Sequence, residues 1–175
     1  ENIGLLLVAM GLALLFTTYQ MAAMAALALT AMLYHALNHA FFKSLLFLTT
    51  GAVLHGTGER SLGKLGGVLR YMPWVGWLAL AGALAAAGLP PLNGFVSEWL
   101  LLQSFLFTLG LPGTFVNMLV PVVAAGVALV AALGGYVMVK FYGVIFLGQP
   151  RESTIARSHD AGVSERVGLV WLAAG

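Results

Sequence analysis

The sequence predicts an all-α protein, a polytopic bundle of transmembrane helices in which one helix is broken by prolines. Of the 175 residues, 61% are hydrophobic and only 8% are charged. A soluble domain averages about 25% charged residues. Long apolar runs follow one another along the chain, and about 20 apolar residues suffice to cross the hydrocarbon core. Two polar segments separate these runs and carry most of the basic residues.

The whole chain, residues 1–175, is predicted to be one transmembrane domain and a fragment of a longer subunit, because both ends lie inside apolar runs. The expected spans are 3–19, 22–55, 74–110 with a break at 88–94, 115–147, and a truncated span from 167. The expected loops are 56–73 and 148–166. Six of the eight Lys and Arg residues fall in these two loops, which the positive-inside rule assigns to the cytoplasm. We therefore expect a multi-pass protein of the cell (inner) membrane.

Each run has a local justification. The first is short but sufficient to span, and Tyr19 and Gln20 mark the turn after it. The second is long enough to cross the membrane with tilt or to protrude. The third is interrupted by "GLPPLNG", and its halves are each too short to span comfortably. The turn "GLPGT" leads to the fourth run, which contains Pro121.

Three formal charges lie inside apolar runs, namely Lys43, Glu98 and Lys140. A charge at mid-membrane costs a few kcal/mol or more, so each of them needs a reason. Lys140 is close to the predicted cytoplasmic end of its span, where its long side chain could reach the interface. Lys43 is far from either end of its run, and Glu98 has too short a side chain to escape. These two residues are the stronger functional candidates.

His35, His39 and Lys43 follow one another at intervals of four, which aligns them on one stripe of an α-helix. Neighbours in this stripe are about 6 Å apart along the axis, a spacing that suits proton hopping through water. Imidazole both gives and takes protons near neutral pH. The alternatives are hydrogen bonding between helices and a zinc site. Zinc is disfavoured because Ala36 replaces the Glu of H-E-x-x-H and no third ligand is near, so no metal is expected.

The predicted helix break consists of Gly88, Pro90, Pro91 and Gly94, and Glu98 follows it. The prolines remove two backbone donors, and the glycines loosen the chain on either side. Broken helices at membrane depth are tolerated where protein or a water-filled cavity satisfies the freed groups, and in transporters they mark ion sites. Glu98 is therefore placed to load and release a proton.

Several other functions are disfavoured. The chain has no cysteine, which excludes thiolate-bound metal, Fe–S clusters and disulfides within it, and no cofactor or catalytic residue is expected. No basic stripe interleaves with aromatics, so nucleic acid is not an expected partner. The segment 58–65 nearly matches a P-loop, but Leu65 replaces the required Ser or Thr and no parallel sheet is predicted. His55 and His159 are interpreted as ordinary surface histidines.

The segments "HALNHAFFKSLLFLTTGAVLH", "LGKLGGVLRYMPW" and "GLPPLNGFVSEWLLLQ" together resemble a known family. It comprises the proton-conducting antiporter-like subunits of respiratory complex I, Mrp-type cation/proton antiporters and membrane-bound NiFe hydrogenases. The resemblance covers nearly the whole chain. "PPLNGFVSEW" and "KFYGVIFLGQPR" favour the type of hydrogenase-4 component B and the formate hydrogenlyase membrane subunit.

This resemblance implies that His35, His39 and Lys43 belong to a hydrophilic axis inside the membrane and that Glu98 occupies the broken helix. Lys140 fits a family position less securely. The family places a further essential Glu–Lys pair in an earlier repeat that this chain lacks. The implied function is proton translocation in a redox-driven complex of the hydrogenase-4/formate hydrogenlyase or NADH-quinone oxidoreductase type.

The implied partners are the other membrane and peripheral subunits of such a complex, with hydrogenase and Fe–S subunits among them, together with the lipid bilayer and protons. Two alternatives stay open. One is an Mrp-type Na⁺/H⁺ antiporter subunit, which works without redox partners. The other is a structural membrane anchor whose polar residues only pack helices.

Overall fold

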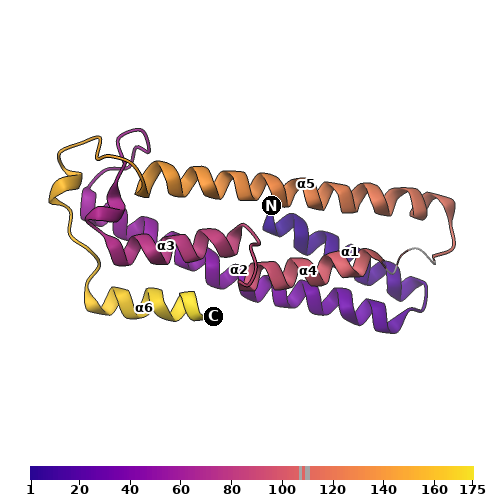
Figure 1. The fold of residues 1–175 in the computed structure, drawn as a ribbon. Coiled ribbons are helices and arrows are strands. Elements are labelled where there is room, and N and C mark those ends of the chain that lie inside the picture. The colour runs from indigo at the N-terminus through magenta and orange to yellow at the C-terminus, as the bar shows by residue number, and fades with distance from the viewer. Residues whose placement is uncertain (107, 109–110) are drawn as a thin grey trace. The chain divides into compact units, whose positions relative to one another are not determined.

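The computed structural model describes residues 1–106, 108 and 111–175, and every regular element in these residues is helical. The all-α prediction is therefore confirmed for the described chain. The α-helices are α1 (Asn2–Thr18), α2 (Ala22–Thr57), α3 (Pro73–Ala86), α4 (Asn93–Leu106), α5 (Thr114–Phe146) and α6 (Val163–Ala174) (Figure 1). The short 3₁₀ turns η1 (Val68–Arg70) and η3 (Ile155–Arg157) lie in the two polar segments.

Within the described residues, α2 and α5 are long and apolar enough to cross a membrane, whereas α1 and α3 are shorter apolar helices. The turn expected at Tyr19 and Gln20 separates α1 from α2, and Gln20 has φ 60°. The interruption expected at 88–94 corresponds to residues 87–92, which are not helical. The expected end of the third run, at 107–110, includes residues 107, 109 and 110, which are outside the described part.

The helix α6 begins at Val163, four residues before the position expected from hydropathy. Its first turn is polar, and local hydrogen bonds explain why it is nevertheless helical. The Glu165 carboxylate accepts the N–H of Gly162 at 3.1 Å, and the Arg166 Nε–H donates to the Ala161 carbonyl at 2.7 Å. The Arg166 guanidinium also lies 5.5 Å from the centre of the Trp74 ring. Capping hydrogen bonds and a cation–π contact therefore stabilise the polar first turn of α6, which hydropathy does not predict to be helical.

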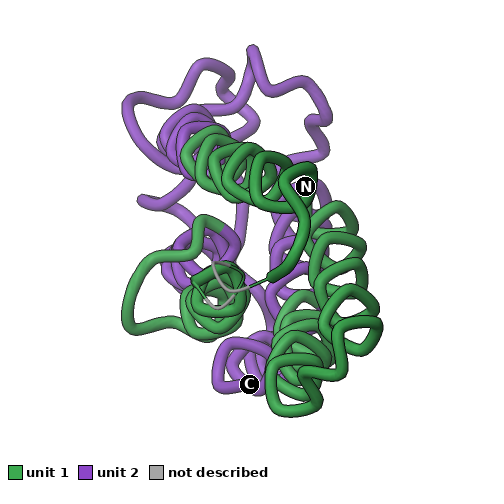
Figure 2. The backbone as a smooth tube through the Cα atoms, turned by 90° about the vertical axis from the view of Figure 1, so that its right-hand side faces the viewer, with its two compact units in different colours: residues 1–39, 87–134 green, residues 40–86, 135–175 purple. Residues whose placement is uncertain are grey.

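The chain forms two compact units, shown in different colours in Figure 2. Unit 1 contains residues 1–39 and 87–134, and unit 2 contains residues 40–86 and 135–175. Both α2 and α5 continue from one unit into the other, and the chain also changes unit at the end of α3.

Unit 1 has a core of aliphatic and aromatic side chains from α1, α2, α4 and α5. Phe16 at the end of α1 is fully buried in it. The other buried members of this core are Leu5, Ala9, Leu12, Ala28, Ala31, Leu101, Phe105, Leu111, Val120 and Val127. The helices that carry the His35 site are therefore held by an apolar core of their own.

Unit 2 is packed around a face of α3 on which small residues predominate beside Val75. Gly76, Ala79, Gly82 and Ala83 are buried on this face. A Cβ atom added at Gly82 would lie 3.2 Å from side-chain atoms of Leu45 and Leu46, so a larger residue there would force these α2 side chains to shift. Small residues permit such close packing between membrane helices.

The two polar segments of unit 2 are attached to each other. The Gly67 N–H donates to the Leu147 carbonyl at 2.8 Å, and Arg151 Nη1 donates to the carbonyls of Leu62 and Gly63, both at 3.3 Å. The loop after α2 and the loop after α5 therefore form one structured region.

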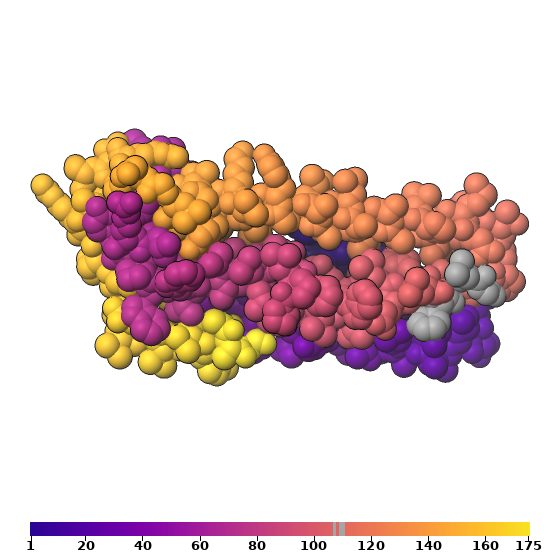
Figure 3. Space-filling model, viewed as in Figure 1, coloured from indigo at the N-terminus to yellow at the C-terminus, as the bar shows by residue number. Residues whose placement is uncertain are grey.

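The helix α5 (orange in Figure 3) exposes apolar side chains along most of its length. These include Phe115, Met118, Val122, Leu129, Leu133, Tyr136, Val137 and Val139. A continuous apolar surface of this kind marks contact with lipid or with another protein surface.

Candidate functional site

The centre of the candidate site in unit 1 is His35, which is only 4% exposed. Its Nδ1 lies 2.9 Å from the Ser97 Oγ of α4, and its Nε2 lies 3.2 Å from the Asn2 Oδ1 of α1. Three helices therefore meet at one imidazole, and both of its nitrogens have partners. Such a ring is oriented by its surroundings and cannot rotate freely.

The Ser97 hydroxyl gives the imidazole two compatible protonation states. Ser97 Oγ lies 2.9 Å from the Gly94 carbonyl as well as 2.9 Å from the histidine. When Nδ1 is unprotonated, the hydroxyl donates its hydrogen to the ring. When Nδ1 carries a proton, it donates to Ser97, and the hydroxyl donates to Gly94 instead. A proton can therefore arrive at or leave His35 without breaking the site's geometry.

A second buried polar side chain, Asn38, fixes the start of α4. Asn38 is 1% exposed, and its Nδ2 donates to the Asn93 carbonyl at 2.8 Å. The Asn93 side chain in turn accepts the N–H of Gly94 at 2.8 Å, which satisfies one of the N–H groups that have no partner within the first turn of α4. The sequence pattern did not identify Asn2, Asn93 or Ser97 as candidate site residues. Their signal was the occurrence of polar residues in apolar surroundings, with Asn93 and Ser97 four residues apart.

Glu98 is half-buried in α4, and its carboxylate occupies the space in front of Gly88. A Cβ atom at position 88 would contact the Glu98 carboxylate. Gly88 also has φ +62°, a conformation that residues with side chains rarely adopt. Glycine at the break thus meets two requirements, the backbone turn and the room for an acidic side chain.

The remaining members of the predicted relay are distributed over both units. His39 is half-buried in unit 1, whereas Lys43 and Lys140 are exposed in unit 2. His35, His39 and Lys43 lie on the continuous helix α2, as their spacing predicted. The four residues of the expected break, Gly88, Pro90, Pro91 and Gly94, belong with Glu98 to unit 1.

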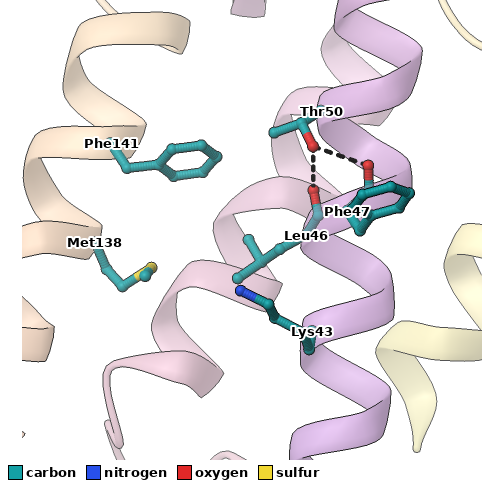
Figure 4. Close-up of a pocket in the computed structure, with 6 residues that line it drawn as sticks. All are labelled: Lys43, Leu46, Phe47, Thr50, Met138 and Phe141. Atoms are coloured by element: carbon teal, nitrogen blue, oxygen red, sulfur yellow. Dashed lines mark hydrogen bonds between the residues drawn. The ribbon is translucent and has the colours of Figure 1, made fainter. Parts of the chain in front are cut away.

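Lys43 lines a pocket of about 240 Å³ in unit 2. Figure 4 shows its ammonium group directed across this pocket from α2 towards Met138 of α5. The remaining walls are Leu46, Phe47, Thr50 and Phe141, and the Thr50 hydroxyl donates to carbonyls of its own helix. The space is large enough for water molecules around a charged amine.

The P-loop-like segment 58–65 is a loop in which the Glu59 carboxylate accepts hydrogen bonds from backbone N–H groups that a bound phosphate would need. The Glu59 carboxylate accepts the N–H groups of Ser61 at 2.8 Å and Arg60 at 2.9 Å. The Lys64 Nζ lies 3.5 Å from Glu59. The hydrogen bond from the Ser61 N–H, aided by the Lys64 charge and the Arg60 N–H, lowers the pKa of Glu59 and keeps it anionic.

His55 and His159 lie close together in unit 2, with ring centres 6.2 Å apart and an edge-to-face arrangement. They line a cavity of about 320 Å³ with Asp160. Asp160 accepts the N–H groups of Trp74 at 2.8 Å and Val75 at 3.3 Å, and so caps the start of α3. Sequence reasoning treated these histidines separately and did not anticipate the cap. Among the described residues, no group of three or more His, Cys, Asp or Glu side chains is arranged to hold a metal ion.

Apolar helices packed around an imidazole, an acidic side chain and a helix break define a membrane domain with protonatable groups in its interior. The chain belongs to the NADH:quinone oxidoreductase/Mrp antiporter transmembrane family, whose model matches residues 9–120. It is thus a membrane domain of the antiporter-like type, as the sequence motifs predicted.

Individual relatives support the family assignment. Over 174 residues the chain is 44% identical to formate hydrogenlyase subunit 3 of Escherichia coli strain K12, covering 99% of this chain and 28% of that protein. It is 33% identical over 174 residues to hydrogenase-4 component B of the same organism, covering 99% of this chain and 26% of that protein. The chain therefore spans little more than a quarter of the length of these relatives.

A solved structure has the same fold. A chain of the membrane-bound sulfane sulfur reductase, an archaeal respiratory membrane complex, superposes with a TM-score of 0.73 and 26% sequence identity. The match covers 99% of this chain and 30% of that one.

Proposed function

We propose that this chain is part of a proton-translocating subunit in a redox-driven membrane complex of the formate hydrogenlyase or hydrogenase-4 type. Protons move along His35, His39, Lys43 and Glu98, and the interruption at Gly88, Pro90, Pro91 and Gly94 makes room for Glu98. The subunit crosses the inner membrane several times, with 56–73 and 148–166 on the cytoplasmic side. Its partners are the other membrane and peripheral subunits, including those that carry the hydrogenase and Fe–S chemistry.

The observation that carries this proposal is the buried His35 with partners on both ring nitrogens. A histidine that served only as a link between helices would need one fixed set of donors. The Ser97 hydroxyl can reverse its hydrogen bond to the ring instead, because its hydrogen can be donated to the Gly94 carbonyl when Nδ1 carries a proton. The similarity to subunits of two hydrogen-metabolising complexes supports the redox-driven type.

The test is proton transfer by the complete complex in proteoliposomes, measured together with its redox turnover. We expect Lys43→Ala and Glu98→Gln to abolish proton transfer while redox turnover stays partly intact, since neither residue touches a redox centre in this proposal. Lys140→Ala decides whether that residue joins the relay or only reaches the interface. Normal proton transfer in both Lys43→Ala and Glu98→Gln would contradict the proposed function.

The main rival is an Mrp-type Na⁺/H⁺ antiporter subunit, which the family description also includes. It predicts a sodium-dependent pH change in vesicles without any redox substrate. The redox-driven subunit predicts no such change and requires turnover of the complex. Genes for hydrogenase and Fe–S subunits next to the full-length gene would favour the redox-driven type.

A structural anchor is the second rival, and it predicts a dry interior around residues 35–43. Lys43→Cys in a cysteine-free version of the full-length protein separates the two functions. Modification of Cys at position 43 by a water-soluble thiol reagent supports the relay. Complete protection in the assembled complex supports the anchor.

A further inference from the structure

A groove in unit 2 combines an apolar wall with a charged rim and has no role in the relay. Its volume is about 380 Å³. Phe47, Gly51 and Leu54 of α2 form one side and Ile145 of α5 forms another, while Arg60 lies at the loop end. The groove shares Phe47 and Thr50 with the Lys43 pocket and extends from there towards the polar loop.

The rim of this groove carries one carboxylate, Glu59, and one guanidinium, Arg60, and their surroundings differ. Glu59 also lines the groove, but it already accepts two backbone N–H groups and faces Lys64 at 3.5 Å. The backbone N–H of Arg60 donates to Glu59. Within the described chain, its guanidinium has no ion pair and no hydrogen bond. An anionic group at the rim would therefore find a free guanidinium, which binds phosphate oxygens in a bidentate manner.

The groove runs along much of one membrane leaflet. From Phe47 to Leu54 its α2 wall rises about 10 Å, and the loop residues Glu59, Arg60 and Leu62 continue the lining beyond the helix. The hydrocarbon core of a bilayer is about 30 Å thick, so one leaflet contributes about half of this. The side chain of Phe47 is 74% exposed and that of Leu62 is 52% exposed, so the wall offers large apolar side chains at both depths.

We propose that this groove binds one anionic phospholipid, with the phosphate at Arg60 and an acyl chain along Phe47, Leu54 and Ile145. The apolar wall buries hydrocarbon, and the guanidinium selects a negatively charged headgroup. A docked protein helix would fit the apolar wall equally well, but it would need an acidic side chain at the level of the loop. An anionic phospholipid supplies both the hydrocarbon chain and the negative charge in one molecule, and such lipids surround a membrane domain.

Two substitutions separate the wall from the rim. A Cβ atom at Gly51 meets nothing within 4 Å, so Gly51→Leu fills the groove without disturbing the helix. Gly168→Leu in α6 is its control, because Gly168 is equally open but does not line the groove. Arg60→Gln removes the rim charge, and Arg157→Gln removes an exposed charge from the other polar segment.

The experiment uses the full-length protein in phosphatidylcholine nanodiscs with a trace of phosphatidylglycerol that carries a photoreactive acyl chain. Crosslinked peptides are identified by mass spectrometry. We expect crosslinks within 47–62 and 141–145. Gly51→Leu should reduce them, and Arg60→Gln should reduce them roughly tenfold, the loss that one charge-assisted hydrogen bond represents. Both control variants should crosslink like the unaltered protein.

Three results would overturn the proposal. Equal crosslinking of the groove by photoreactive phosphatidylcholine and by phosphatidylglycerol would leave Arg60 without a role. Crosslinking unaffected by Gly51→Leu would place the lipid elsewhere. An absence of crosslinks in the unaltered protein would mean that another segment of the full-length chain or a second protein covers the groove.

Discussion

At the scale of single residues, Ser97 is the side chain on which the proposed proton-transfer role of His35 depends. It can act as donor or acceptor towards His35, because its hydroxyl has the Gly94 carbonyl as an alternative acceptor. The histidine therefore keeps two hydrogen bonds in each protonation state.

Replacing Ser97 by Ala leaves Nδ1 of His35 buried without a partner. An unsatisfied buried group costs about 1–3 kcal/mol, so we expect slower proton transfer and a small loss of stability. Ser104→Ala is the matched control, because Ser104 is also fully buried in α4 but bonds only to its own helix at Leu100. The measurement is proton transfer and thermal unfolding of the full-length protein. Equal effects of the two substitutions would show that the contact with His35 has no special role.

Gly88 is the second single residue on which the site depends, because of its left-handed backbone and its closeness to the Glu98 carboxylate. Gly88→Ala should destabilise the protein by about 1–2 kcal/mol for the left-handed backbone alone. It should also displace the Glu98 carboxylate and reduce proton transfer. Gly126→Ala in α5 is the control, because a Cβ atom there meets nothing within 4 Å. Thermal unfolding and proton transfer of both variants check this, and an unchanged Gly88→Ala variant would contradict the assigned close contact.

At the scale of elements, α3 depends on a residue far away in the sequence. Pro73 occupies the first helical position, and Asp160 accepts the next two N–H groups of the helix. Asp160→Ala should therefore cost about 1 kcal/mol of stability, while Asp160→Asn should cost less because it keeps an oxygen acceptor. Thermal unfolding of the full-length protein measures both. A larger effect of Asn than of Ala would rule out the capping role.

The sequence predicted those features that depend on local patterns. Hydropathy located the long helices, the proline pair located the break between α3 and α4, and spacing aligned His35 and His39 on α2. It failed for Asn2, Ser97 and Asp160, because periodicity defines the face of a helix but not the helix that packs against it. It also began α6 too late, although Glu165 three residues after Gly162 is a visible capping signal.

At the scale of the whole molecule, the distribution of basic residues predicts membrane orientation. Ser61→Cys and Ser153→Cys in the two polar segments should react with an impermeant thiol reagent from the cytoplasmic side. Thr114→Cys, at the start of α5 just after the turn without charges, should react from the opposite side. The measurement uses a cysteine-free version of the full-length protein in membrane vesicles of known orientation. Labelling of positions 61 and 153 from opposite sides would refute the expected topology.

The close approach of Gly88 to Glu98 has a consequence for the divergence of this chain. Position 88 cannot change freely, since a larger residue there is strained by the left-handed backbone and displaces the Glu98 carboxylate. Lineages that replace the glycine must also move the acidic side chain at position 98. Positions 88 and 98 should therefore evolve together. Transfer of only one of these two residues into a related protein should not reproduce the contact.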